Sequence, residues 1–162
     1  MNTHDIARSL ADLFAEITTG APKDGTFIVN PNDLGLIGSL GKLSATEASR
    51  SVHDGATIAA HAAHIAYGLS LMNRWATEGG NPFADAKWNE AWQITTVDEQ
   101  RWQQIRADLE KQVLRWLDVL EQPREVIPIE LSGMLGSVAH TAYHLGAIRQ
   151  ISAKVRGPRE GT

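Results

Sequence analysis

Four of the six histidines occur as two close pairs, and imidazole is the commonest metal-binding side chain in proteins. His140 and His144 are four residues apart, a spacing that places both rings on one face of a helix, where one ion can bridge them. His61 and His64 are three residues apart and can also share a face. Because a bundle can direct side chains from facing helices to a common point, two such pairs predict a metal site.

The alternative is that these histidines bind no metal and are ordinary core or boundary residues. Spacing alone leaves both interpretations open. The other two histidines are expected to be solvated. His4 lies near the N-terminus, and His53 lies in a stretch rich in Ser, Asp and Gly.

The composition limits the chemistry further. The chain has 162 residues and no cysteine, which excludes disulfides, thiolate metal sites and cysteine nucleophiles. We expect a single domain at residues 1–157 and a loose tail at residues 158–162. The net charge is −4 and no basic stripe occurs, so nucleic acid is not an expected partner. Neither a signal peptide nor an apolar run of about 18 residues is apparent, so we expect a cytoplasmic protein without a membrane span.

Apolar residues recur at helical spacing in four segments, and no strand pattern of comparable length occurs. The segments are residues 6–17, 57–76, 98–120 and 131–155. A connection rich in Gly, Pro, Asn and Asp spans residues 20–45, with a short helix expected at residues 34–43. Such a long connection either lies near a site or is a plain crossover. The predicted fold class is all-α, a four-helix bundle with a long first connection.

Other polar and aromatic residues allow weaker hypotheses. Acids near predicted helix ends could reach a pocket mouth but are expected to be surface charges; they are Asp54, Glu78, Asp85 and Glu90. Tyr67 and Tyr143 neighbour the histidines and are expected to pack with a solvated hydroxyl.

Two tryptophans and one arginine allow further hypotheses. Trp88 and Trp92 could cover an open metal, although packing between the second and third helices is the interpretation we favour. Arg149 could bind a carboxylate, but a surface salt bridge is favoured.

Small residues in the last helix, Gly133, Gly136, Ser137 and Ala139, are expected to let a neighbouring helix approach closely.

The last of these segments contains a recognisable motif. AHTAYHLGAIRQI resembles the last-helix signature of the DinB-like (YfiT-like) superfamily of metal-dependent four-helix bundles: two histidines four apart, then Gly and Gln-Ile. Here the Gln-Ile pair is displaced to Gln150 and Ile151. The segment TIAAHAAHIAYGLSLMNRW resembles the second helix of that family, which carries one ligand histidine.

The resemblance implies three ligands, His64, His140 and His144, with His61 as the rival for the first position. It also implies zinc or nickel, with iron as an alternative, and a small-molecule substrate. Since three histidines leave coordination positions open, the expected function is that of a metal-dependent hydrolase or of a transferase that uses a low-molecular-weight thiol such as bacillithiol or mycothiol. A homodimer is also expected. The alternatives are a stress-related binding module with a non-catalytic metal and a helical dimer without metal.

Overall fold

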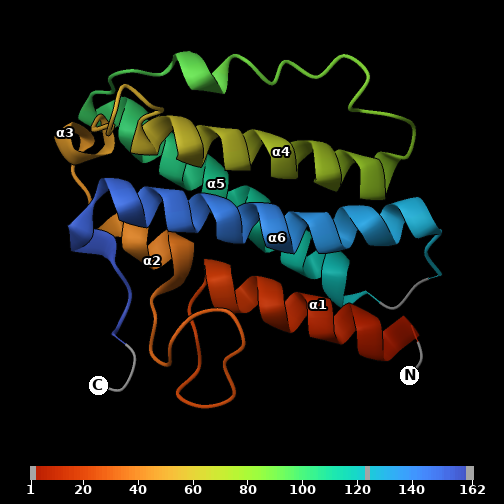
Figure 1. Ribbon diagram of the computed structural model, residues 1–162. Helices are drawn as coiled ribbons and strands as arrows, with labels where there is room; N and C mark the ends of the chain where they lie inside the picture. Colours follow the sequence, from red (N-terminus) through yellow and green to blue (C-terminus); the bar gives the residue numbers. More distant parts are fainter. Residues whose placement is uncertain (1–2, 123–124, 160–162) are drawn as a thin grey trace.

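The computed structural model describes residues 3–122 and 125–159, and in these residues every regular element is helical (Figure 1). The all-α prediction is therefore confirmed for the described part of the chain. The four long helices are α1 (Thr3–Thr18), α4 (Ile58–Glu78), α5 (Glu99–Glu121) and α6 (Pro128–Ile151). Shorter elements are α2 (Gly35–Gly41), α3 (Ala45–Ala48) and two 3-10 turns, η1 (Ala91–Gln93) and η2 (Ala153–Val155).

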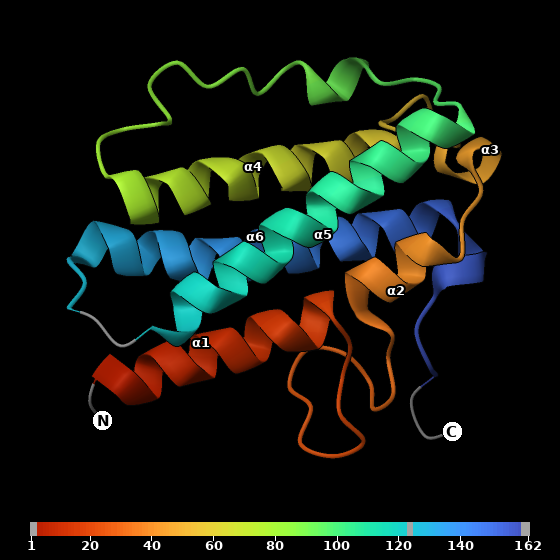
Figure 2. The same cartoon turned by 180° about the vertical axis from the view of Figure 1, so that it is seen from behind.

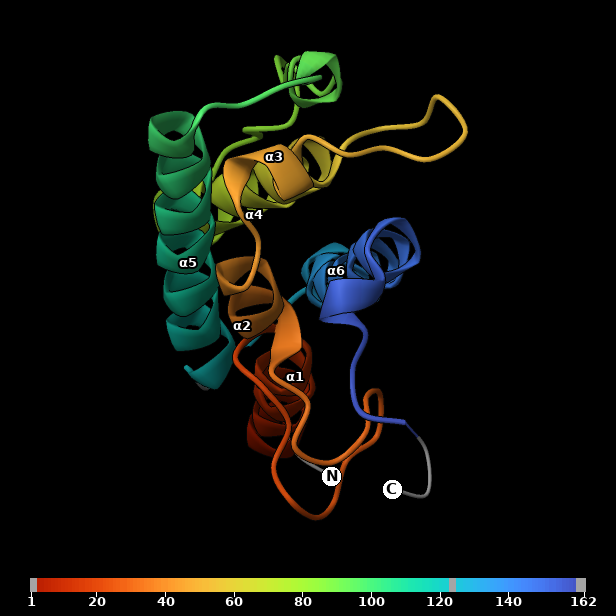
Figure 3. The ribbon, with the colours of Figure 1, turned by 90° about the vertical axis from the view of Figure 1, so that its left-hand side faces the viewer.

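The four long helices enclose one core. Helix α1 contacts α5 and α6, and α4 contacts the same two helices, so that the contacts form a closed ring. Helix α5 runs obliquely across α1 and α4 (Figure 2). In the view of Figure 3, α1, α4 and α6 are seen close to end-on, with α5 beside them. This arrangement brings the middle of α4 next to the middle of α6.

Helix α5 illustrates how the apolar pattern produces the packing. Six of its residues, at steps of three and four, are buried: Trp102, Ile105, Leu109, Val113, Trp116 and Leu120. Each large side chain of this kind contributes roughly 1.5–3 kcal/mol when it leaves water. Both buried indoles also find acceptors, since the Nε1–H of Trp102 donates to the Leu43 carbonyl at 2.8 Å and that of Trp116 donates to Ser137 Oγ at 2.8 Å.

The ends of α4 and α6 follow local rules, with one departure from the prediction. The side chain of Thr57 caps α4 by accepting a hydrogen bond from the Ala60 N–H at 3.1 Å, and Gly79 ends it with a φ of 71°. Helix α6 begins at Pro128, a favoured first position. The prediction of one continuous helix to residue 155 is wrong: extended backbone at Ser152 separates α6 from η2.

The long first connection is a crossover that two buried carboxylates hold in place. Glu16 accepts hydrogen bonds from three successive backbone N–H groups, those of residues 27–29, at 2.7–3.1 Å. Asp33 forms an ion pair of 2.6 Å with Arg149 of α6. Its first part, residues 20–34, lies on the α1 side of the molecule, away from α4, and the chain after α2 runs to α3 beside the start of α4 (Figures 1 and 2).

The end of the described chain lies against this connection, where Gly157 approaches the Asp33 carboxylate closely. Pro158 in the predicted tail accepts a 2.7 Å hydrogen bond from Asn30 Nδ2, and residues 160–162 lie outside the described part.

A second connection, residues 79–98, runs along the outer side of α4 (Figure 1). Two hydrogen bonds attach it to the helix: Thr57 Oγ1 donates to the Ile94 carbonyl at 2.6 Å, and the Lys87 N–H donates to the Tyr67 hydroxyl at 2.8 Å. This connection brings the tryptophan-bearing segment over the histidines. Among the described helices, none has the length and hydropathy needed to cross a bilayer.

Candidate metal site

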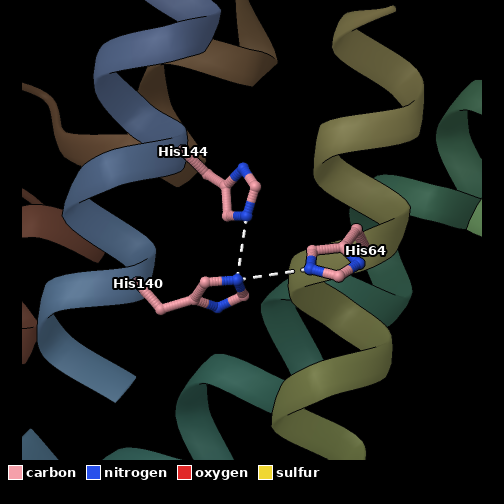
Figure 4. Close-up of side chains that lie close together, drawn as sticks. All are labelled: His64, His140 and His144. Atoms are coloured by element: carbon pink, nitrogen blue, oxygen red, sulfur yellow. Dashed lines mark hydrogen bonds between the residues drawn. The ribbon is translucent and has the colours of Figure 1, made fainter. Parts of the chain in front are cut away.

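His64 of α4 and the pair His140 and His144 of α6 point toward one another (Figure 4). One ring nitrogen from each of the three lies within 4.8 Å of the other two. The Nε2 atom of His140 is 3.2 Å from Nε2 of His64 and 2.9 Å from Nε2 of His144. The structure thus brings together the three residues that the sequence singled out as ligands, from segments 76 residues apart in the chain.

Hydrogen bonds among the three rings cannot satisfy all of these ring nitrogens. A ring nitrogen of a neutral histidine carries either one hydrogen or one lone pair, so Nε2 of His140 cannot form ordinary hydrogen bonds with both neighbours. A cation can accept all three lone pairs. Nitrogens bound tetrahedrally at about 2.0–2.1 Å from one ion lie about 3.3 Å apart, close to the two separations observed here. The donor set fits a divalent transition metal, since imidazole suits zinc, nickel and iron.

The surroundings of the rings keep them neutral and leave one of them accessible. His64 and His144 are buried, whereas His140 is exposed. Burial, together with the neighbouring His140 and His61, lowers the pKa of His64 to about 4. Burial and the other three histidines lower the pKa of His144 to about 3. The part of the His140 ring that is covered by its neighbours is enough to lower the pKa of this residue as well. Their lone pairs are therefore free of protons at neutral pH, as metal binding requires.

His61, the rival ligand, lies behind the group rather than in it. Its Nδ1 atom is 2.9 Å from Nδ1 of His144, on the opposite side of that ring from Nε2. If Nε2 of His144 faces an ion without a hydrogen, its Nδ1 carries one and donates it to His61. Hydrogen bonds of this kind fix the tautomer and orientation of a ligand histidine. His61 is thus placed to hold His144, and burial lowers its own pKa as well.

The two tryptophans of the second connection lie on the histidines. Trp92 is 4.3 Å from His64 between ring centroids and 5.4 Å from His61, and Trp88 is 5.8 Å from His64. Packing between the second and third helices, the role that we favoured for these residues, is therefore wrong. Both side chains remain about one-third exposed, so they cover the site only in part. Nδ1 of His64 is buried without a hydrogen-bond partner, and these aromatic contacts therefore position its ring.

No acidic side chain joins the site in the described part of the chain. The four acids considered from the sequence are all exposed, and none of the hydrogen bonds or ion pairs of the histidines involves a carboxylate. Glu78 pairs instead with Arg74, and Glu90 with Lys87. These acids are surface charges, as expected.

The remaining candidates lie outside the histidine group. Tyr143 is exposed and touches the His144 ring edge-on, while the Tyr67 hydroxyl accepts the hydrogen bond from Lys87. His53 is exposed, in a turn with a φ of 51°, and the side chain of His4 lies outside the described residues. Arg149 forms a salt bridge, although with a buried partner rather than on the surface.

No family model, curated protein or solved structure matches this chain. The resemblance to the DinB-like superfamily therefore rests on the two helix motifs alone.

Proposed function

We propose that the protein binds one divalent transition-metal ion, zinc or nickel with iron as the alternative, on His64, His140 and His144. The convergence of three ring nitrogens from α4 and α6 within 4.8 Å carries this proposal. The closed ring of four long helices and the position of the histidine pair in the last long helix are in keeping with a four-helix bundle of the DinB-like type.

A site with three histidine ligands suits catalysis better than a purely structural role, because structural zinc sites are usually closed by four protein ligands. An ion held in this way polarises a carbonyl, or lowers the pKa of a water or thiol that binds to it. The chain contributes the surroundings. His140 is exposed and leaves an approach for a small molecule, the ring of His61 holds that of His144, and Trp92 covers one side of the His64 ring.

Between the two reactions expected from the sequence, the geometry favours a thiol-dependent transfer over hydrolysis. Hydrolysis of amides and esters commonly uses a side-chain base within hydrogen-bond reach of the attacking water. In the described residues no carboxylate bonds to the histidines, and Tyr143 points outward. A dication lowers the pKa of a bound water only to about 7, whereas it deprotonates a bound thiol outright, so the thiol-dependent reaction depends less on such a base. The proposed activity is therefore the transfer of a low-molecular-weight thiol to, or its removal from, a small electrophilic substrate.

The same lack of a side-chain acid or base favours a second candidate, a binding module whose metal takes no part in turnover. Zinc-loaded and nickel-loaded protein should be assayed with thiol–acceptor pairs and with a panel of esters, amides and lactones, each with and without a chelator. Chelator-sensitive consumption of a thiol and its acceptor supports the proposed transfer. Chelator-sensitive cleavage of an ester or amide would assign hydrolysis instead, and no sensitive turnover would leave the binding module.

A further inference from the structure

A narrow cavity of about 180 Å³ lies beside His140, between α4, α6 and the second connection. Its walls include Ile65, Leu69, Met72, Phe83 and Trp88. None of its lining residues is Asp, Glu, Lys or Arg. We call this cavity the apolar slot.

The hydroxyl of Ser137, a polar group in the wall of the apolar slot, is already engaged. Ser137 Oγ donates to the Met134 carbonyl at 2.7 Å and accepts from Trp116 Nε1 at 2.8 Å. The apolar slot therefore offers a ligand mainly hydrocarbon and aromatic surface, with the ring of His140 at one side.

Glycines create the space. At Gly133 a Cβ would come within 2.8 Å of the Trp75 ring, so this glycine serves close helix packing, as the sequence predicted. At Gly136 a Cβ would meet nothing within 4 Å, and at Gly68 it would lie 3.7 Å from Trp88. The prediction of close helix approach is therefore wrong for Gly136. Gly136 lies one helical turn before His140 and lines the apolar slot, and its missing side chain leaves the space beside that histidine free.

We propose that the apolar slot binds an uncharged, apolar group of the substrate, about the size of a phenyl ring, while the polar group attached to it lies at the three histidines. This inference rests on the proposed metal site. The size follows from the volume, since a cavity of roughly 150 Å³ lined by apolar side chains accommodates benzene. A charged or strongly hydrated group would bind weakly between such walls, because they offer no hydrogen bonds to replace those that the group loses with water. In a thiol-dependent transfer the slot would therefore hold the acceptor substrate rather than a polar thiol.

The test compares two probes that carry the same metal-binding group, acetohydroxamate and benzohydroxamate, on the zinc-loaded protein. Burial of the phenyl ring should make benzohydroxamate bind roughly ten- to a hundredfold more tightly. Gly136→Leu should fill the space and remove most of this preference while the affinity for acetohydroxamate is kept. Gly146→Leu is the matched control: it makes the same change in α6, where a Cβ also meets nothing within 4 Å, two residues past His144 and on another face. It should keep the preference.

The outcomes separate this proposal from the one on which it rests. If the protein takes up zinc and binds both hydroxamates equally, the proposed role of the apolar slot is refuted, whereas the proposed metal site is not. If the protein takes up no zinc, the proposed function fails and this inference with it. Gly68→Ala, whose Cβ makes only ordinary contact with Trp88, provides a second variant should Gly136→Leu not fold. A preference unchanged in every folded slot variant would also overturn the proposal.

Discussion

Helix α6 contributes to two buried polar clusters, which differ in the partners that their polar groups find. Near its C-terminal end, Arg149 pairs with Asp33, which also accepts a 2.8 Å hydrogen bond from the Gly35 N–H. One turn earlier, both ring nitrogens of His144 lie at hydrogen-bond distance from other histidines, at 2.9 Å in each case. The first cluster pairs opposite charges within the protein, whereas the second gathers lone pairs that the protein does not satisfy. The two clusters therefore call for different tests: removal of one member of the charge pair should change stability, and removal of the converging lone pairs should change metal binding.

The largest effect is expected from a variant that removes two histidines of the second cluster. His140→Ala with His144→Ala should weaken zinc binding at least about a hundredfold, because only one ligand histidine remains. The fold should survive, since the change takes polar rings out of a site that does not satisfy them and alanine favours helix. Zinc titration and circular dichroism measure the two effects. His53→Ala, at an exposed turn, is the control and should bind one equivalent; full uptake by the double variant would refute the ligand assignment.

Removal of the charge partner in the first cluster should act on stability instead. Asp33→Ala leaves Arg149 largely buried without its counter-charge, and we expect a loss of about 3–5 kcal/mol in the free energy of unfolding. Zinc stoichiometry of the folded protein should not change. Glu78→Ala, which breaks the exposed pair with Arg74, is the control and should cost about 0.5 kcal/mol or less. Equal losses for the two variants would show that the Asp33 cluster does not support the fold.

A third prediction concerns pH and the metal-free protein. The pKa values of His64 and His144 lie at about 4 and about 3 in the folded state, below the usual 6.5, so the unfolded state binds more protons between these values. Stability should therefore fall as pH decreases from about 6.5 to about 4, by an amount on the order of 1–3 kcal/mol. Urea unfolding at several pH values measures it. A variant with both histidines replaced by Gln should lose most of this dependence, and an unaltered slope in that variant would contradict the assignment.

The smallest effect should come from the residue behind the ligands. His61→Ala removes the acceptor for Nδ1–H of His144, and we expect about tenfold weaker zinc binding without loss of the one-to-one stoichiometry. His61→Asn offers a side-chain oxygen near the same place and should restore most of the affinity. If His61→Ala abolished binding altogether, His61 would be a ligand and its assigned position behind His144 would be wrong.

The sequence predicts those features that depend on local periodicity. The stripe from Trp102 to Leu120 specifies α5, and the spacing of His140 and His144 specifies that both rings share a face. The sequence does not predict features that depend on where a connection runs. Trp92 reaches the histidines because Thr57, 37 residues before Ile94, holds the connection against α4. Local rules carry no information on such a contact.

The choice between His61 and His64 shows the same limit. The two rings are less than one turn apart on α4, and either could have faced α6. The rotation of α4 against α6 decides which one meets His140, and this depends on packing along the whole helix. The resemblance to a family motif favoured His64, and the structure places that ring beside His140.

X-ray absorption spectroscopy of the zinc-loaded protein would show directly whether His64, His140 and His144 bind the ion. We predict one zinc per chain with three imidazole nitrogens at about 2.0–2.1 Å and one or two oxygen ligands from solvent. The imidazole signal should disappear with the metal in the variant that lacks His140 and His144. Zinc coordinated by fewer than two imidazoles, or no stoichiometric zinc after incubation, would contradict the account.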